Sequence, residues 1–174
     1  MTVKIQLLSD LHLEVHPHFV PMPAPGADLL VLAGDVGSYQ GGSLLKDDDF
    51  GLGRFSPRYG WPTPVLYVPG NHEYDGLDFD ATHARLRQTC ERLGITWLER
   101  ETVTLAQLTG IATRPVRFVG TTLWTDFMRA SGNFFRNSTV RFSSTSQPAT
   151  ICTAACFEIA PTSDMAMPAQ PKLA

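Results

Sequence analysis

Three short polar segments of this sequence contain most of the side chains that can do chemistry. They are Asp10-Leu11-His12, Gly34-Asp35 and Gly70-Asn71-His72-Glu73. Carboxylate, imidazole and amide groups are side chains that bind divalent metal ions. We therefore expect Asp10, His12, Asp35 and Asn71 to be metal ligands, and we expect His72 to lie beside them as a candidate general acid.

The spacing within these segments supports a shared site. A carboxylate and an imidazole two residues apart, directly after a strand, can turn toward one point above the carboxyl end of a sheet, where α/β proteins bind ligands. Asp35 has two carboxylate oxygens and can bridge two cations, while Asn71 adds a neutral oxygen. Glycines at positions 34 and 70 permit the tight turns that such a site needs.

Each polar segment follows a short apolar run that predicts a buried strand. The runs are Val3 to Leu8, Asp28 to Ala33 and Val65 to Val68. Continuous apolar strands are typical of parallel sheets that are covered on both faces. The sequence therefore predicts an α/β fold in which the strand ends hold the site.

A helix is predicted from Phe79 to Leu93, because apolar residues recur there at helical spacing. Asp80 is the expected cap at its start, and Gly94 is the expected stop. Further short strands are expected at Ile95 to Leu98, Val103 to Leu105 and Val116 to Gly120.

Residues 37–64 interrupt this pattern. They are rich in glycine and without periodicity, which predicts an insertion loop over the carboxyl ends of the strands. The acidic run Asp47-Asp48-Asp49 is interpreted as a solvated loop. The aromatic residues Phe55, Tyr59 and Trp61 could stack on a nucleotide base or anchor the loop to the core, and we favour anchoring.

The last part of the chain has a different composition. From residue 131 onward, half of the residues are Ser, Thr, Ala or Pro, and no helical or strand period persists apart from a brief run at Thr139 to Phe142. Such segments lack the patterned apolar surface that ordering requires. We therefore expect a domain over residues 1–128 and a disordered, low-complexity tail over residues 129–174.

The overall composition excludes several classes of protein. The chain has 174 residues, 43 % of them hydrophobic, and a net charge of -3, which predicts one globular domain and does not favour a nucleic-acid-binding surface. No apolar run approaches the roughly 20 residues of a membrane span, and the N-terminus lacks a secretory signal, so we expect a cytoplasmic protein. Three cysteines argue against a disulfide framework.

The motifs D-x-H, G-D and G-N-H-E, in this order and spacing, resemble the calcineurin-like metallophosphoesterase family. Four blocks carry the resemblance, and together they cover roughly residues 3–128: Leu7 to Glu14 (LLSDLHLE), Asp28 to Val36 (DLLVLAGDV), Val68 to Tyr74 (VPGNHEY) and Gly120 to Phe127 (GTTLWTDF). The resemblance implies a β-sandwich flanked by helices around a two-metal centre.

The resemblance also implies a function. Asp10 and His12 would bind the first metal, Asp35 would bridge, Asn71 would bind the second metal, and His72 would assist the leaving group. Two divalent ions, such as Mn, Fe, Zn or Mg, would activate a water for hydrolysis of a phosphomonoester or phosphodiester, including a nucleotide substrate.

One departure from the family pattern opens an alternative. Family members complete both metal sites with histidines in their second half, but this chain has no histidine after His83. Neither His83 nor the loop histidines His16 and His18 is an expected substitute. The alternative to an enzyme is therefore a truncated or frame-shifted, non-enzymatic remnant that binds one metal or none, with an incomplete sandwich.

Overall fold

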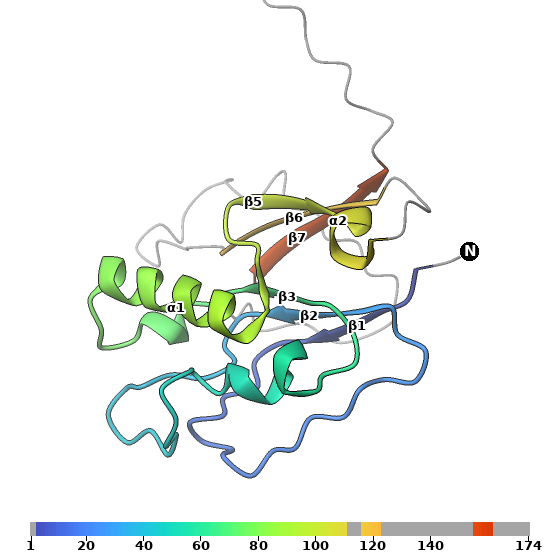
Figure 1. The fold of residues 1–174 in the computed structure, drawn as a ribbon. Coiled ribbons are helices and arrows are strands. Elements are labelled where there is room, and N and C mark those ends of the chain that lie inside the picture. The colour runs from blue at the N-terminus through green and yellow to red at the C-terminus, as the bar shows by residue number, and fades with distance from the viewer. Residues whose placement is uncertain (1–2, 111–115, 123–154, 162–174) are drawn as a thin grey trace, which may run out of the picture.

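A computed structural model describes residues 3–110, 116–122 and 155–161 of the chain. Within these residues the structure is mixed α/β, with two sheets and one long helix (Figure 1). No helix in the described ranges combines the length and the apolar content that crossing a bilayer requires.

The first sheet is parallel throughout and has the order β1-β2-β3-β4. Its strands are β1 (Ile5–Leu8), β2 (Leu29–Ala33), β3 (Val65–Val68) and β4 (Thr96–Trp97). Every residue of β2 and β3 is buried, because the sheet is covered on both faces. The predicted parallel strands are thus confirmed, with their carboxyl ends at a common edge. Strand β1 was expected to be buried but is only partly so, because it lies at the edge of the sheet.

The second sheet is antiparallel and has the order β5-β6-β7. It consists of β5 (Glu101–Thr104), β6 (Val116–Thr122) and β7 (Ala155–Pro161). The short helix α2 (Leu105–Thr109) follows β5 directly, because Thr104 and Gln107 form a capping box that ends the strand before Leu105.

Strand β7 corrects one expectation about the tail. No regular element was predicted at 155–161, yet these residues pair with β6 along its whole length, from Val116 opposite Pro161 to Thr122 opposite Ala155. A strand whose partner is distant in sequence leaves little local signal, since the pairing itself stabilises it. The rest of the predicted tail, including Thr139 to Phe142, lies outside the described residues.

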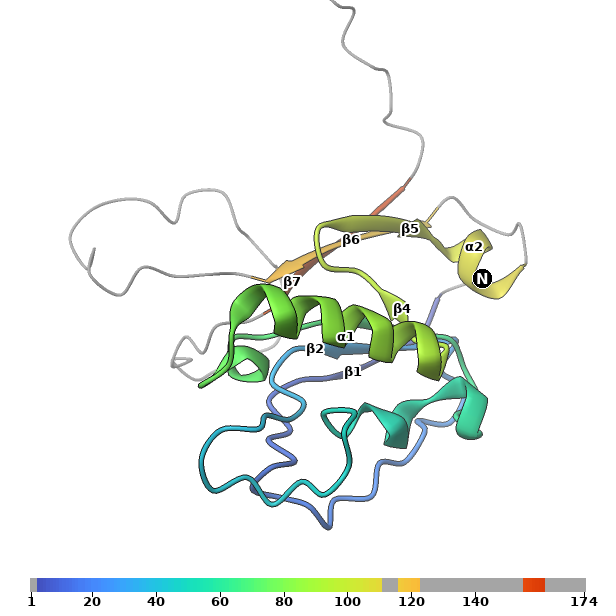
Figure 2. The ribbon, with the colours of Figure 1, turned by 60° about the vertical axis from the view of Figure 1, so that its left-hand side comes forward.

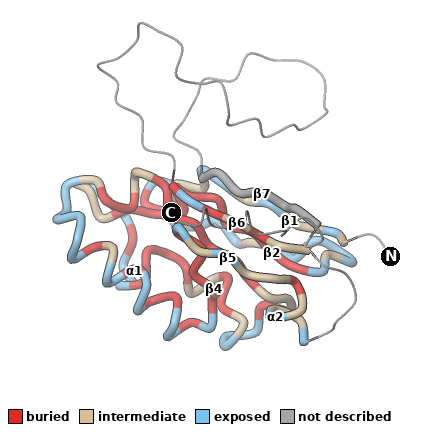
Figure 3. Tube along the Cα trace, turned by 90° about the horizontal axis from the view of Figure 1, so that it is seen from above, coloured by how far each residue is buried: buried red, intermediate tan, exposed pale blue. Residues whose placement is uncertain are grey.

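The two faces of the parallel sheet contact different layers. One face packs against the second sheet and α2, where Leu29, Val31 and Val68 form one buried cluster with Phe118 of β6 and Leu105 of α2. Leu30 and Tyr67 point to the opposite face, which is covered by helix α1 (Phe79–Leu93) and part of the 37–64 segment. Figure 2 shows this layering, and Figure 3 shows the buried residues along the strands and the inner side of α1.

Helix α1 has the predicted bounds but a different cap. Asp78, not Asp80, is the N-cap residue, and its side chain accepts a hydrogen bond from the backbone N–H of Ala81. Asp80 lies in the first turn, where a negative charge interacts favourably with the helix dipole. Gly94 ends the helix in a left-handed conformation, as expected.

Only part of the 37–64 segment lies beside the strand ends, where the sequence predicted a loop: Ser38 and Leu44 donate hydrogen bonds to Glu14, in the loop after β1. The segment contains two short 3-10 helices, η1 (Leu52–Phe55) and η2 (Pro57–Tyr59), and its apolar residues pack against the α1 face of the sheet. Phe55 and Trp61 are buried, with ring centroids 5.6 Å apart, so these two rings anchor the segment as favoured. Tyr59 is 70 % exposed and does not anchor it.

The acidic run within this segment divides into two kinds of residue. Asp47 and Asp48 are exposed, as expected for a solvated loop. Asp49 is buried and accepts hydrogen bonds from the backbone N–H groups of Gly51 and Gly53. Asp49 therefore stabilises the turn that precedes η1.

Candidate metal centre

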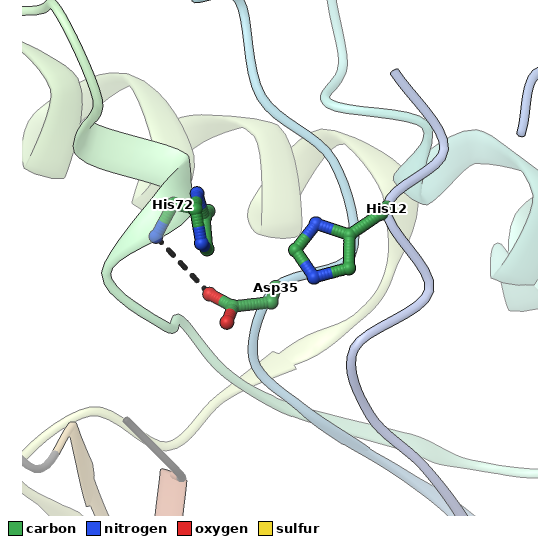
Figure 4. A group of neighbouring side chains, drawn as sticks. All are labelled: His12, Asp35 and His72. Atoms are coloured by element: carbon green, nitrogen blue, oxygen red, sulfur yellow. Dashed lines mark hydrogen bonds between the residues drawn. The ribbon is translucent and has the colours of Figure 1, made fainter. Parts of the chain in front are cut away.

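Three side chains from different segments meet at the carboxyl edge of the parallel sheet. His12 follows β1, Asp35 follows β2, and His72 begins the 3-10 helix η3 (His72–Tyr74) after β3. One potential ligand atom from each lies within 4.8 Å of the other two. Figure 4 shows the two rings and the carboxylate around a common space.

Backbone hydrogen bonds extend beyond the strands and align the first two segments. The N–H of Asp10 donates to the carbonyl of Gly34 at 3.1 Å, and the N–H of His12 donates to the carbonyl of Asp35 at 3.1 Å. Leu13 continues this pairing by donating to Val36 at 2.9 Å. The parallel alignment of β1 and β2 thus sets the position of His12 relative to Asp35.

Three of the predicted ligands have an unusual backbone conformation. Asp10, His12 and Asp35 have φ angles of 53°, 46° and 52°. Residues with side chains rarely adopt this left-handed region, and such strain is concentrated at functional sites. The conformation turns the chain sharply after each strand.

Gly34 and Gly70 allow the two strand ends to approach one another. A Cβ atom at Gly34, where φ is +80°, would lie 2.8 Å from the Cα of Gly70. A Cβ atom at Gly70 would lie 2.1 Å from Oδ1 of Asp35. The absence of side chains at both positions therefore leaves room for the Asp35 carboxylate.

Glu73 supports this loop from within the core. Its side chain is fully buried and accepts hydrogen bonds from the N–H groups of Asp35, Val36 and Gly70, at 3.2, 2.7 and 2.8 Å. Burial is the main cause that raises the pKa of Glu73 to about 7, and the nearby charge of Asp35 raises it further. The G-N-H-E motif contained this residue, but sequence reasoning assigned it no role.

The His12 ring also has a buried carboxylate partner. Nδ1 of His12 lies 3.0 Å from Oε1 of Glu14, a side chain that is only 2 % exposed. Sequence reasoning missed this contact. Residues 13–15 form a turn, in which the carbonyl of His12 accepts hydrogen bonds from the N–H groups of Val15 and His16, both at 2.9 Å, so a rule for extended chains could not have found it.

His72 contacts both other members of the group. Its backbone N–H donates to Oδ1 of Asp35 at 3.1 Å, and its ring packs edge-on against the His12 ring with centroids 4.9 Å apart. Its Nδ1 lies 2.6 Å from Oδ2 of Asp75, in an ion-pair contact outside regular hydrogen-bond geometry. The side chain of His72 remains 36 % exposed.

The environment of Asp35 disfavours its charged form. Burial raises the pKa of the Asp35 carboxyl, and the charge of Asp10 acts in the same direction. The N–H of His72 and the two imidazoles lower the pKa, but less than burial raises it. A cation bound here would compensate a carboxylate that the protein alone compensates incompletely.

The other predicted residues lie around this group. Asp10 is exposed and outside the set of three, although its charge acts on Asp35. Asn71 precedes His72 as the N-cap of η3 and is partly buried. His83 lies elsewhere, with its Nδ1 3.0 Å from the hydroxyl of Tyr74.

Residues 120–122, the described part of the fourth motif block, belong to the second sheet and contact the loop that precedes the site. Thr122, at the end of β6, donates from its hydroxyl to the carbonyl of Pro69 at 2.7 Å. Its backbone N–H donates to the buried carboxylate of Glu99. The antiparallel sheet thereby supports the loop that begins at Pro69 and leads to His72.

Comparisons of this chain with family models, with curated proteins and with solved structures find no match. The function of this chain is therefore inferred from its motifs and from the geometry of the site.

Proposed function

We propose that this chain is a metal-dependent phosphoester hydrolase of the calcineurin-like metallophosphoesterase type. One observation carries the proposal: His12, Asp35 and His72 converge at the carboxyl edge of the parallel sheet. These residues come from the three motifs that resemble the family. The β-sandwich of that family is part of the same proposal.

The residues present fit a divalent transition ion. The imidazole of His12 and the carboxylates of Asp35 and Asp10 are donor types suited to Mn, Fe or Zn, and burial disfavours the charged form of Asp35 in the absence of a cation. His12 and Asp35 would hold the first ion together with Asp10. Asp35 and Asn71 would hold a second ion.

The proposed chemistry divides between the ions and the protein. When bound, a pair of ions lowers the pKa of water and stabilises charge on the phosphoryl group. His72 would donate a proton to the leaving oxygen as a general acid, and Asp75 would orient its ring. The partial exposure of both rings, 31 % for His12 and 36 % for His72, gives a phosphomonoester or phosphodiester access to this edge.

A second candidate function is binding of a single ion without turnover. The observation that favours it is that the described residues contain one group of three convergent ligand side chains, and Asp10 lies outside it. Two oxygen ligands, from Asp35 and Asn71, would hold a second transition ion weakly, because imidazole usually provides much of the affinity at such sites.

Metal analysis combined with a hydrolysis assay separates the two functions. The chain would be loaded with Mn²⁺, its metal content per chain measured, and its hydrolysis of bis-p-nitrophenyl phosphate followed. Hydrolysis with two ions per chain supports the enzyme, and one ion without hydrolysis supports the binding protein. The variant His83→Gln is a matched control, because His83 lies outside the group of three. A chain that binds no ion contradicts both.

A further inference from the structure

Glu14 is a buried carboxylate whose two oxygens have separate partners. Oε1 lies 3.0 Å from Nδ1 of His12, and Oε2 accepts a hydrogen bond from the backbone N–H of Ser38 at 3.2 Å. The side chain is 2 % exposed. A charge so deeply buried is retained at low cost only when its partners satisfy it.

The contact between the Glu14 carboxylate and the His12 imidazole determines which nitrogen of His12 carries the proton. An ionised carboxylate can only accept hydrogen bonds, and a neutral imidazole has one N–H donor and one acceptor nitrogen. Nδ1 of His12 must therefore be the donor, which leaves Nε2 as the acceptor. Figure 4 shows the His12 ring beside the Asp35 carboxylate, in the group that would hold the ion.

We propose that Glu14 is a positioning residue that fixes the tautomer and the orientation of His12, so that Nε2 is available as a ligand. The inference rests on the proposed function for the ion itself. Partners that orient ligating histidines in this way typically contribute 10- to 100-fold to metal affinity. We expect Glu14→Gln to weaken Zn²⁺ binding by about that factor.

A purely structural role would give a different result. Glu14 also connects to the 38–44 segment, because its carbonyl accepts a hydrogen bond from the N–H of Leu44 at 2.9 Å and Oε2 binds Ser38. If this anchoring were its only role, substitution would lower stability without changing the protonation pattern of the His12 ring. The tautomer is therefore the decisive readout.

The first measurement is ¹⁵N NMR of the histidine rings in the metal-free wild-type chain at about pH 8, where an ordinary imidazole is neutral. We expect the proton of His12 on Nδ1. A ring that carries its proton mainly on Nε2 overturns the proposal. This measurement needs no variant, so it tests the assigned tautomer of His12 even if Glu14→Gln fails to fold.

The second measurement compares Glu14→Gln with Glu101→Gln by NMR and Zn²⁺ titration. A glutamine amide can donate or accept, so Glu14→Gln should mix the His12 tautomers and raise the Kd for Zn²⁺. The control Glu101→Gln removes a half-exposed carboxylate that pairs with Arg87. It should change neither the His12 tautomer nor the Kd for Zn²⁺. Unchanged tautomer and affinity in Glu14→Gln overturn the proposal. A wild-type chain that binds no Zn²⁺ contradicts the proposed function instead, and the NMR result still decides the role of Glu14.

Discussion

The carboxylate of Asp35 lies at the centre of the candidate site, because it lies close to residues that follow two other strands. It accepts the N–H of His72, and it shares the group of three with His12. Asp35→Asn keeps the size of the side chain but removes its charge and one anionic donor. We expect the loss of at least one ion per chain by elemental analysis, with Asp80→Asn on the exposed side of α1 as the unchanged control. Full metal content and unchanged hydrolysis would refute the bridging role.

His72 differs from Asp35 in its expected contribution. If His72 is the general acid, His72→Ala should retain the ions and lower turnover by about 10²- to 10⁴-fold. The measurement is kcat together with metal content in the same sample. Because its ring lies within the group of three, a loss of metal in His72→Ala would instead identify His72 as a direct ligand.

The buried carboxyl group of Glu73 should make the free energy of unfolding of the metal-free chain depend on pH. Burial raises its pKa from an ordinary 4.5 to about 7, so the folded chain binds more protons than the unfolded chain between these pH values. The free energy of unfolding should therefore fall as the pH rises through this window, by up to about 3 kcal/mol, and level off above it. Urea unfolding at several pH values measures this fall. The fall in unfolding free energy should be smaller in Glu73→Gln. An equal fall in the variant and the wild-type chain would contradict the assignment of this pH dependence to Glu73.

At the scale of single residues, the sequence predicted that His12, Asp35 and His72 lie close together, but it also predicted Asp10 as a ligand, which lies outside this group, and it did not predict what supports them. His12 and Asp35 were identifiable because each follows a buried strand, and parallel strands end at one edge. The buried carboxylates Glu14 and Glu73 could not be assigned from type and position alone. Whether a carboxylate faces solvent or accepts backbone hydrogen bonds depends on tertiary packing.

The elements of the fold were predictable to different extents. Strands β2 and β3 and helix α1 have strong local patterns, and their observed bounds agree closely with expectation. The 37–64 segment has no periodicity, so its packing on the α1 face could not be derived from pattern. Only burial of residues such as Phe50 shows which layer it covers.

The close approach of two strand-end loops gives a prediction at the element scale. Gly34→Ala places a Cβ atom 2.8 Å from the Cα of Gly70, in addition to the cost of an unfavourable φ. Gly76→Ala has a similar φ of +70° but nothing within 4 Å, so it should cost only about 1 to 2 kcal/mol. We expect Gly34→Ala to cost more in urea unfolding and to lose metal binding. Equal effects of the two substitutions would contradict a steric role for Gly34.

At the scale of the whole molecule, strand β7 joins a distant part of the chain to the domain. A chain that ends at residue 154 leaves β6 without this partner, and we expect faster amide exchange in Val116–Thr122 and more self-association. A chain that ends at residue 161 keeps β7 and is the matched control. Hydrogen-exchange mass spectrometry and size-exclusion chromatography measure the two effects. Identical exchange in both chains would show that β7 does not protect β6.

The left-handed backbone at Asp10, His12 and Asp35 costs stability at the same positions that supply proposed ligands. Glycine would adopt these φ angles without strain, so replacing any of the three would relieve the backbone of the metal-free chain. Each replacement would also delete a proposed ligand. This is a stability–activity trade-off located in three residues. Engineering that selects for a more stable fold alone would favour glycine first at Asp10, whose side chain is exposed, because glycine at His12 or Asp35 also removes the contacts with Glu14 and His72.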